Sequence, residues 1–221
     1  ISGTDAGDFS INSSSGALTF ASTPNYEIPT DADVNNTYII TVTATDDGSG
    51  SLTDTQTLTV TVTDVNEAPV ITSSSSTSFA ENNTSTVITV TSSDVDSGSS
   101  ATYGISGTDA DDFSINSSSG ALTFASTPNY EGAVDSNTDN DYIVIVTVTD
   151  GALTDTQTLT VTVTNVDDVD PVITSDGGDD TGSISFAENS TSAVTTVTST
   201  DEDNFPGTLY SISGTDASVF D

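Results

Sequence analysis

Residues 142–150 read Y-I-V-I-V-T-V-T-D, and residues 158–164 read T-L-T-V-T-V-T. Apart from the final Asp150, every second residue in each stretch is apolar, so one face of an extended chain carries only apolar side chains. The apolar faces are Tyr142, Val144, Val146 and Val148 in the first stretch, and Leu159, Val161 and Val163 in the second. Residues 38–44 repeat the pattern with Tyr38, Ile40, Val42 and Ala44. This alternation predicts β-strands with one buried face, and Gly and Ser at the turns predict an all-β chain.

The chain repeats itself at an interval of about one hundred residues. I-S-G-T-D-A begins at positions 1, 105 and 212, and F-A-E-N begins at positions 79 and 186. One β-sandwich domain has roughly 100 residues, whereas solenoid repeats are much shorter. We therefore expect tandem Greek-key β-sandwich domains of the immunoglobulin-like kind, with about seven strands each.

These intervals divide the chain into three predicted pieces. Residues 1–67 form the C-terminal part of one repeat, residues 68–170 a complete repeat, and residues 171–221 the N-terminal half of a further repeat. Two interpretations of the partial repeats stay open. The chain is a window on a longer array, or half-domains of neighbouring chains complete each other to form a filament.

The composition is unusual in its charge. The 221 residues include 34 Asp and Glu and no Lys, Arg or His, which gives a formal net charge of −34. Acidic clusters are therefore expected to be solvated, protonated or metal-bound. Nucleic acid is not expected as a partner, since it needs basic patches. No apolar run approaches the roughly 20 residues of a membrane span, so membrane insertion of this segment is not expected either.

Oxygen-bearing side chains recur in register with the repeat, at expected strand ends and loops. The clearest are the two linkers, T-D-V-N-E-A-P at residues 63–69 and T-N-V-D-D-V-D-P at residues 164–171. Others are F-A-E-N at residues 79–82, D-V-D-S-G at 94–98 and P-N-Y-E at 128–131. Calcium requires six to eight hard oxygen ligands from several chain segments. This inventory can supply them, so Ca²⁺ is the predicted cofactor.

The order of these motifs, with a Tyr strand ending in Asp150-Gly151, resembles a cadherin repeat over essentially the whole chain. The resemblance is closest to the cadherin-like repeats of large bacterial surface proteins of the adhesin type. It implies calcium at the joints between consecutive domains. At the first joint, the implied ligands are Glu27, Asn66, Glu67, Asp94, Asp96 and Asp150. At the second joint, they are Glu81, Glu131, Asp167, Asp168, Asp201 and Asp203.

The chain also departs from the family pattern. The family's Asp-Arg-Glu element reads Asn25-Tyr26-Glu27 in one repeat and Asn129-Tyr130-Glu131 in the next. The position after D-V-D-S-G that usually holds Asn is Ser100, and the second linker is one residue longer than the first. These differences leave the number of ions at each joint open.

The predicted function is that of an extracellular, cell-surface or secreted stalk, stiffened by calcium, with a structural and cell-adhesion role. Its partners would be calcium ions and neighbouring repeats of the same or an identical chain. Glycans stay open as a further partner, because six Asn residues lie in Asn-x-Ser/Thr sequences: Asn12, Asn35, Asn82, Asn83, Asn116 and Asn189. No enzymatic activity is expected, since nucleophile–histidine chemistry needs residues that the chain lacks.

Overall fold

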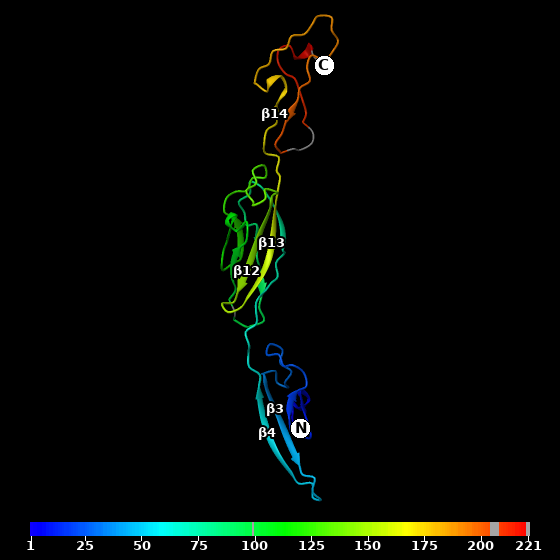
Figure 1. Ribbon diagram of the computed structural model, residues 1–221, viewed down its shortest axis with the longest axis vertical. Helices are drawn as coiled ribbons and strands as arrows, with labels where there is room; N and C mark the ends of the chain where they lie inside the picture. The colour runs from blue at the N-terminus through cyan, green and yellow to red at the C-terminus, as the bar shows by residue number, and fades with distance from the viewer. Residues whose placement is uncertain (99, 204–207, 220–221) are drawn as a thin grey trace. The chain divides into compact units, whose positions relative to one another are not determined.

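The computed structural model describes residues 1–98, 100–203 and 208–219. Within these ranges the chain forms β-strands, loops and four short 3₁₀ turns, and it has no α-helix (Figure 1). The all-β prediction is therefore confirmed. No helix in the described part of the chain is long and apolar enough to cross a membrane.

The chain divides into two compact units. The first comprises Ile1–Val70, Ser92–Ala101 and Val148–Asp155, and the second comprises Ile71–Thr91, Thr102–Thr147 and Thr156–Asp221. The pieces predicted from the repeat interval, 1–67, 68–170 and 171–221, stay predictions. Of these, the second and third include residues 99, 204–207 and 220–221, which lie outside the described residues.

The segment predicted as the complete repeat carries two sheets, which together contain seven strands. The first sheet has the order β6 (Ser76–Ala80), β13 (Thr154–Thr164), β12 (Asp141–Thr149) and β9 (Thr102–Ser106), and β6 is parallel to β13. The second sheet has the order β10 (Phe113–Ile115), β11 (Ala121–Phe124) and β7 (Ile88–Thr89). Figure 1 shows β12 and β13 side by side along this repeat. The expected seven-stranded sandwich is confirmed.

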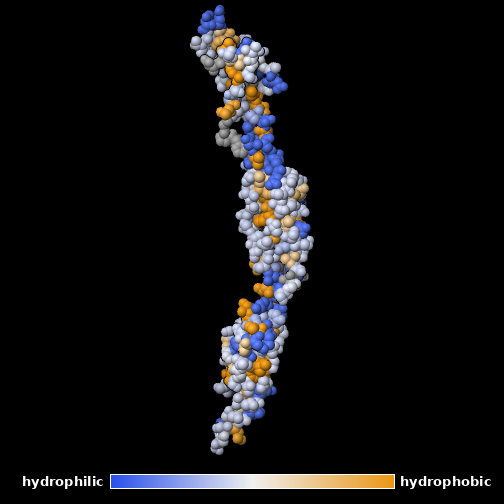
Figure 2. All heavy atoms as spheres, turned by 180° about the vertical axis from the view of Figure 1, so that it is seen from behind, coloured by the Kyte–Doolittle hydropathy of each residue, from blue (hydrophilic) through white to orange (hydrophobic). Residues whose placement is uncertain are grey.

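The core of this repeat is the alternating face that the sequence predicted. The side chains of β12 and β13 that it contributes are all buried: Tyr142, Val144, Val146, Val148, Leu159, Val161 and Val163. Phe113 and Phe124 pack edge-on against Tyr142, with ring centroids 5.7 and 5.2 Å away. Burial of each such side chain contributes about 1.5–3 kcal/mol to stability. Outward positions are mostly Ser and Thr, so most of the surface visible in Figure 2 is pale, the colour of intermediate hydropathy.

The segment predicted as the earlier, partial repeat contains two antiparallel hairpins. In the first, β1 (Phe9–Ile11) pairs with β2 (Leu18–Phe20), and in the second, β3 (Thr37–Thr45) pairs with β4 (Thr53–Thr61). Phe9, Tyr38 and Ile40 form a buried cluster. On the predicted apolar face of β3, Tyr38 and Ile40 are buried, but Val42 is half-buried and Ala44 is exposed. Burial fades toward the end of the hairpin, where alternation alone does not guarantee a covering layer.

The remaining strands are short. They are β5 (Val70–Ile71), β8 (Ser92–Ser93), β14 (Val172–Ile173) and β15 (Ser199–Thr200). β5 pairs with β8, and β14 pairs with β15. The 3₁₀ turns are Ala6–Asp8, Ala110–Asp112, Ser175–Gly177 and Ala217–Val219.

Some buried carboxylates have a purely structural role. Asp109, 3% exposed, accepts backbone hydrogen bonds from Ser136 (2.8 Å) and Ile143 (2.7 Å). Asp135, 2% exposed, accepts them from Asp139 and Asn140. The expectation that acidic clusters are solvated, protonated or metal-bound was incomplete, because backbone N–H groups also stabilise a buried carboxylate. These two side chains fasten the long loop before β12.

Candidate metal centres

Two groups of four carboxylates converge, each within one compact unit. The first is Glu27, Asp64, Glu67 and Asp96, and the second is Glu81, Glu131, Asp168 and Asp203. In each group, one oxygen from every carboxylate lies within 4.8 Å of the others. We call them the first and the second centre. Oxygens on opposite sides of one calcium ion, at about 2.4 Å from it, lie about 4.8 Å apart, so each group fits around a single ion.

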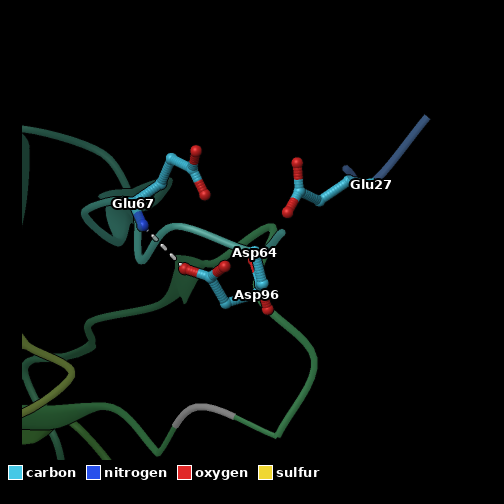
Figure 3. A group of neighbouring side chains, drawn as sticks. All are labelled: Glu27, Asp64, Glu67 and Asp96. Atoms are coloured by element: carbon cyan, nitrogen blue, oxygen red, sulfur yellow. Dashed lines mark hydrogen bonds between the residues drawn. The ribbon is translucent and has the colours of Figure 1, made fainter. Parts of the chain in front are cut away.

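Loops and the linker position the first centre (Figure 3). The side chain of Asn25 accepts hydrogen bonds from the backbone N–H groups of Glu27 (2.8 Å) and Ile28 (3.0 Å), which fixes the turn that presents Glu27. The N–H of Glu67 donates to Oδ2 of Asp96 at 2.8 Å. Figure 3 shows the carboxylates of Glu27 and Glu67 turned toward each other above Asp64 and Asp96. Four chain positions far apart in sequence therefore present oxygen to one place.

Further hydrogen bonds position residues next to this centre. Asn66 donates its side-chain N–H to Oδ2 of Asp150 at 2.7 Å, and Oδ1 of Asp150 accepts from the N–H groups of Leu153 and Ala152. These hydrogen bonds, those of Leu153 first, lower the pKa of Asp150. Oδ1 of Asp94 accepts the N–H of Asp96 at 3.0 Å. Oδ2 of Asp94 is buried and has no hydrogen-bond partner within the described ranges.

The second centre is more deeply buried. Glu81 is 3% exposed, and its two carboxylate oxygens accept the N–H groups of Tyr130 (2.8 Å) and Val166 (2.7 Å). Asp203 is 2% exposed, and its Oδ2 accepts the N–H groups of Asp168 (2.9 Å) and Val169 (2.7 Å). The backbone thus holds the two inner carboxylates in place.

Further contacts place the outer residues of the second centre. Asn82 donates its side-chain N–H to Oδ2 of Asp168, and the N–H of Asp203 donates to Oδ1 of Asp201 at 3.1 Å. Asp167 is exposed and is not one of the four converging residues.

Several oxygen atoms in the second centre or next to it are buried without a protein partner. They are Oε1 of Glu131, Oδ1 of Asp203 and Oδ1 of Asn165, none of which has a hydrogen-bond partner in the described part of the chain. An unpaired buried oxygen costs about 1–3 kcal/mol, and more when it is charged. A bound cation would remove this cost at Glu131 and Asp203 together, so the donor set fits a hard divalent ion such as calcium.

Both centres also raise the pKa of one of their own carboxyl groups. Partial loss of hydration, followed by the charges of Glu27 and Asp96, raises the pKa of Glu67. Burial, followed by the charges of Glu81 and Asp203, raises the pKa of Glu131. A raised carboxyl pKa means that the folded state disfavours the ionised form. Crowding of negative charge is the cause that a cation would reverse.

Seven of the twelve residues implied by the resemblance lie in these converging groups: Glu27, Glu67, Asp96, Glu81, Glu131, Asp168 and Asp203. Three more, Asn66, Asp94 and Asp201, each form a hydrogen bond with a member of a group, and Asn66 donates its side-chain N–H to the backbone carbonyl of Glu67. Asp150 contacts Asn66 and reaches the first centre only through it. The assignment of all twelve as calcium ligands stays a prediction. The ligand set implied by the resemblance did not include Asp64, a member of the first centre, or Asn165, which contacts the second. Both occupy the same position in the two linkers, and this equivalence was the available signal.

Comparison with known proteins points to one family. Residues 75–164 match the cadherin domain. None of the curated proteins is significantly similar in sequence. Among solved structures, the chain is similar to the protocadherin gammaB7 EC3–6 cis-dimer, with 26% identity and a TM-score of 0.61 over 88% of this chain and 48% of that one. It is also similar to mouse cadherin-23 EC22–24, with 28% identity and a TM-score of 0.50 over 72% and 50% of the two chains.

A third similar structure is the protocadherin gammaB4 extracellular domain, with 26% identity and a TM-score of 0.51 over 76% of this chain and 28% of that one. The chain therefore spans half the length of these structures or less. Residues 75–164 match the cadherin domain, and the chain as a whole is similar in fold to cadherin extracellular domains.

Proposed function

We propose that this chain is an array of cadherin-like repeats that binds calcium at its two centres and serves as a structural and adhesive stalk outside the cell. The kind of protein we propose is a large bacterial surface protein of the adhesin type. Its binding partners would be calcium ions and neighbouring repeats.

One observation supports this proposal above the others. In a chain with no Lys, Arg or His, eight carboxylates gather into two groups of four. In the second group, Asp203 is almost wholly buried and its Oδ1 has no partner among the described residues. A solvated acidic surface would not bury an unpaired carboxylate oxygen, because the loss of hydration is too expensive. A cation at the centre gives that oxygen a partner.

The energies are large enough to control the joint. Two like charges about 4 Å apart repel by roughly 4 kcal/mol at an effective dielectric constant of 20. Four converging carboxylates therefore oppose the closed arrangement when no cation is present. A calcium site stabilises the bound form by about 2.7 kcal/mol when free calcium is a hundredfold above Kd. We therefore propose that calcium stiffens the linkers and that its removal loosens them.

Small-angle X-ray scattering of the 221-residue chain tests this proposal. In millimolar calcium we expect a narrow range of particle dimensions, and in excess chelator a broad one. The variant Glu27→Gln/Glu131→Gln removes one carboxylate from each centre. At low calcium its scattering should resemble that of the unaltered protein in excess chelator. Asp47→Asn, on the exposed β3–β4 turn outside both centres, is the matched control. Identical scattering with calcium and with chelator would contradict the proposal.

A second candidate function is supported by a different observation. Phe79 is 6% exposed and lies 5.5 Å from Phe124 between ring centroids, whereas its repeat equivalent Phe186 is 44% exposed. A half-domain of a neighbouring chain could cover Phe186, and such exchange would build a filament. Sedimentation of the 221-residue chain in calcium separates the candidates, because a filament subunit forms concentration-dependent oligomers and a stalk segment stays monomeric.

A further inference from the structure

The two linkers differ at the positions that face the centres. Aligned from Thr63 and Thr164, they read Asp-Val-Asn-Glu at residues 64–67 and Asn-Val-Asp-Asp at residues 165–168. The carboxylate and the carboxamide have therefore exchanged places. In the first linker Asp64 is one of the four converging residues, while Asn165 stands at the same position in the second. Asp167, which carries the exchanged carboxylate, is exposed and outside the converging group.

Asn165 contacts one residue of the second centre, and the residue that follows it contacts another. Its side-chain N–H donates to the backbone carbonyl of Asp203 at 2.7 Å, and the N–H of the next residue, Val166, donates to Glu81 at 2.7 Å. The first contact fixes the orientation of the amide, because a flipped amide would set two oxygens against each other. The remaining oxygen, Oδ1, is buried and has no hydrogen-bond partner in residues 1–98, 100–203 or 208–219.

We propose that Oδ1 of Asn165 is a calcium ligand of the second centre, in the place that the carboxylate of Asp64 takes in the first. The exchange keeps an oxygen ligand but removes one negative charge. It therefore sets the calcium affinity of the second centre below the value that Asp at this position would give. This inference rests on the proposed function, since it assumes that the centre binds calcium.

The burial of the second centre gives a physical reason for a neutral ligand there. Glu81 and Asp203 are almost fully buried, and the burial of Glu131 together with its acidic neighbours already raises its pKa. A fifth carboxylate at position 165 would add repulsion in the calcium-free state, at low local dielectric. An amide supplies the oxygen without this cost. In the first centre Asp64 is exposed, so hydration lowers the cost of its charge.

Terbium can report on each centre separately. Terbium occupies oxygen-ligated calcium sites, and its luminescence is excited through a nearby aromatic ring. The chain has no Trp, while Tyr26 and Tyr130 directly precede Glu27 and Glu131. Tyr130→Phe should therefore remove the luminescence of terbium bound at the second centre, and Tyr26→Phe should remove that of terbium bound at the first. Titration with terbium, followed by displacement with calcium, then gives one affinity for each centre.

Three variants test the role of Asn165. Asn165→Asp, read in the Tyr26→Phe background, should tighten calcium binding at the second centre on the order of tenfold, and Asn165→Ala should weaken it to a similar degree. Asp64→Asn, read in the Tyr130→Phe background, should weaken the first centre alone. Urea denaturation of each calcium-free variant shows whether it remains folded.

The two Asn165 variants also separate ligation from a purely structural role. Both remove the N–H that Asn165 donates to Asp203, but only Asn165→Asp keeps an oxygen at this position. Equal weakening by both variants would mean that Asn165 acts only through its N–H and would overturn the inference. Unchanged affinity in both would overturn it as well. If neither centre of the unaltered chain binds terbium or calcium, the proposed function itself fails.

Discussion

The backbone N–H of Glu67 donates to Oδ2 of Asp96 at 2.8 Å, across 29 residues of sequence. This contact joins the linker to the Asp94-Val95-Asp96 loop and brings two members of the first centre together. The equivalent contact in the second centre runs from Asp168 to Asp203 at 2.9 Å. A hydrogen bond from an uncharged backbone donor thus links two members of each centre.

Replacement of Asp96 by Asn should disable the first centre selectively. The amide oxygen can still accept the N–H of Glu67, so the loop remains in place, but one carboxylate is lost. We expect the calcium affinity of the first centre to fall on the order of tenfold or more, because affinity depends on the charge count of the ligands. Isothermal titration calorimetry measures the change. Asp203→Asn should lower the calcium affinity of the second centre alone. A variant that weakened both centres equally would contradict the presence of two separate calcium sites.

Calcium should stabilise the chain far more than its ionic strength explains. With a net charge of −34, the folded chain is destabilised by self-repulsion, which any salt screens. Calcium at 1 mM should raise Tm clearly, whereas sodium chloride at the same ionic strength, about 3 mM, should have little effect. Circular dichroism melting with a chelator control measures this. Equal effects of the two salts would indicate screening and not binding.

Two glycines at equivalent repeat positions allow the cost of a steric clash to be separated from the cost of backbone strain. Gly16 and Gly120 have φ of +72° and +71°, but a Cβ on Gly16 would meet nothing within 4 Å, while one on Gly120 would lie 2.2 Å from the carbonyl oxygen of Val90. Gly16→Ala should destabilise its hairpin by about 1 kcal/mol. Gly120→Ala should cost about 3 kcal/mol or more, since the backbone at Val90 must also move. Hydrogen exchange of the two hairpins measures the difference.

Asp112 should destabilise the fold when it is ionised. Burial, followed by the charges of Asp109, Asp111 and Asp135, raises the pKa of this carboxyl above its ordinary value of 3.8. The penalty is therefore present at pH 7 and disappears as the pH falls below the ordinary value. Asp112→Asn should raise Tm at pH 7, and the gain should shrink toward pH 4.

Thermal melts across this pH range test the Asp112 prediction, and Asp47→Asn is the control. Asp47 is exposed and is not one of the charges that raise the pKa of Asp112, so its replacement should change Tm little at any pH. A gain at Asp112 that stayed constant with pH would contradict an electrostatic origin.

Many of the β-strands could be predicted from the sequence because strand periodicity is a local pattern. The alternation from Tyr142 to Val148 places every second side chain on one face, whatever the rest of the chain does. The structure buries all four of these residues, and Leu159, Val161 and Val163 behave in the same way. Ala44 shows the limit of this reasoning: it continues the pattern of Tyr38 and Ile40 but is exposed, since burial needs an opposing layer.

The sequence by itself determined the β-strands, the repeat interval and the absence of any side-chain cation to pair with 34 acidic residues. Only the tertiary structure decided which carboxylates meet and which are held by the backbone. Asp109 and Asp203 are both loop aspartates. Backbone N–H groups donate hydrogen bonds to both carboxylate oxygens of Asp109, while Oδ1 of Asp203 has no hydrogen-bond partner in the described part of the chain. The reason is physical: strand periodicity is written in neighbouring residues, whereas a metal site is made by contacts between residues as far apart as Glu27 and Asp96.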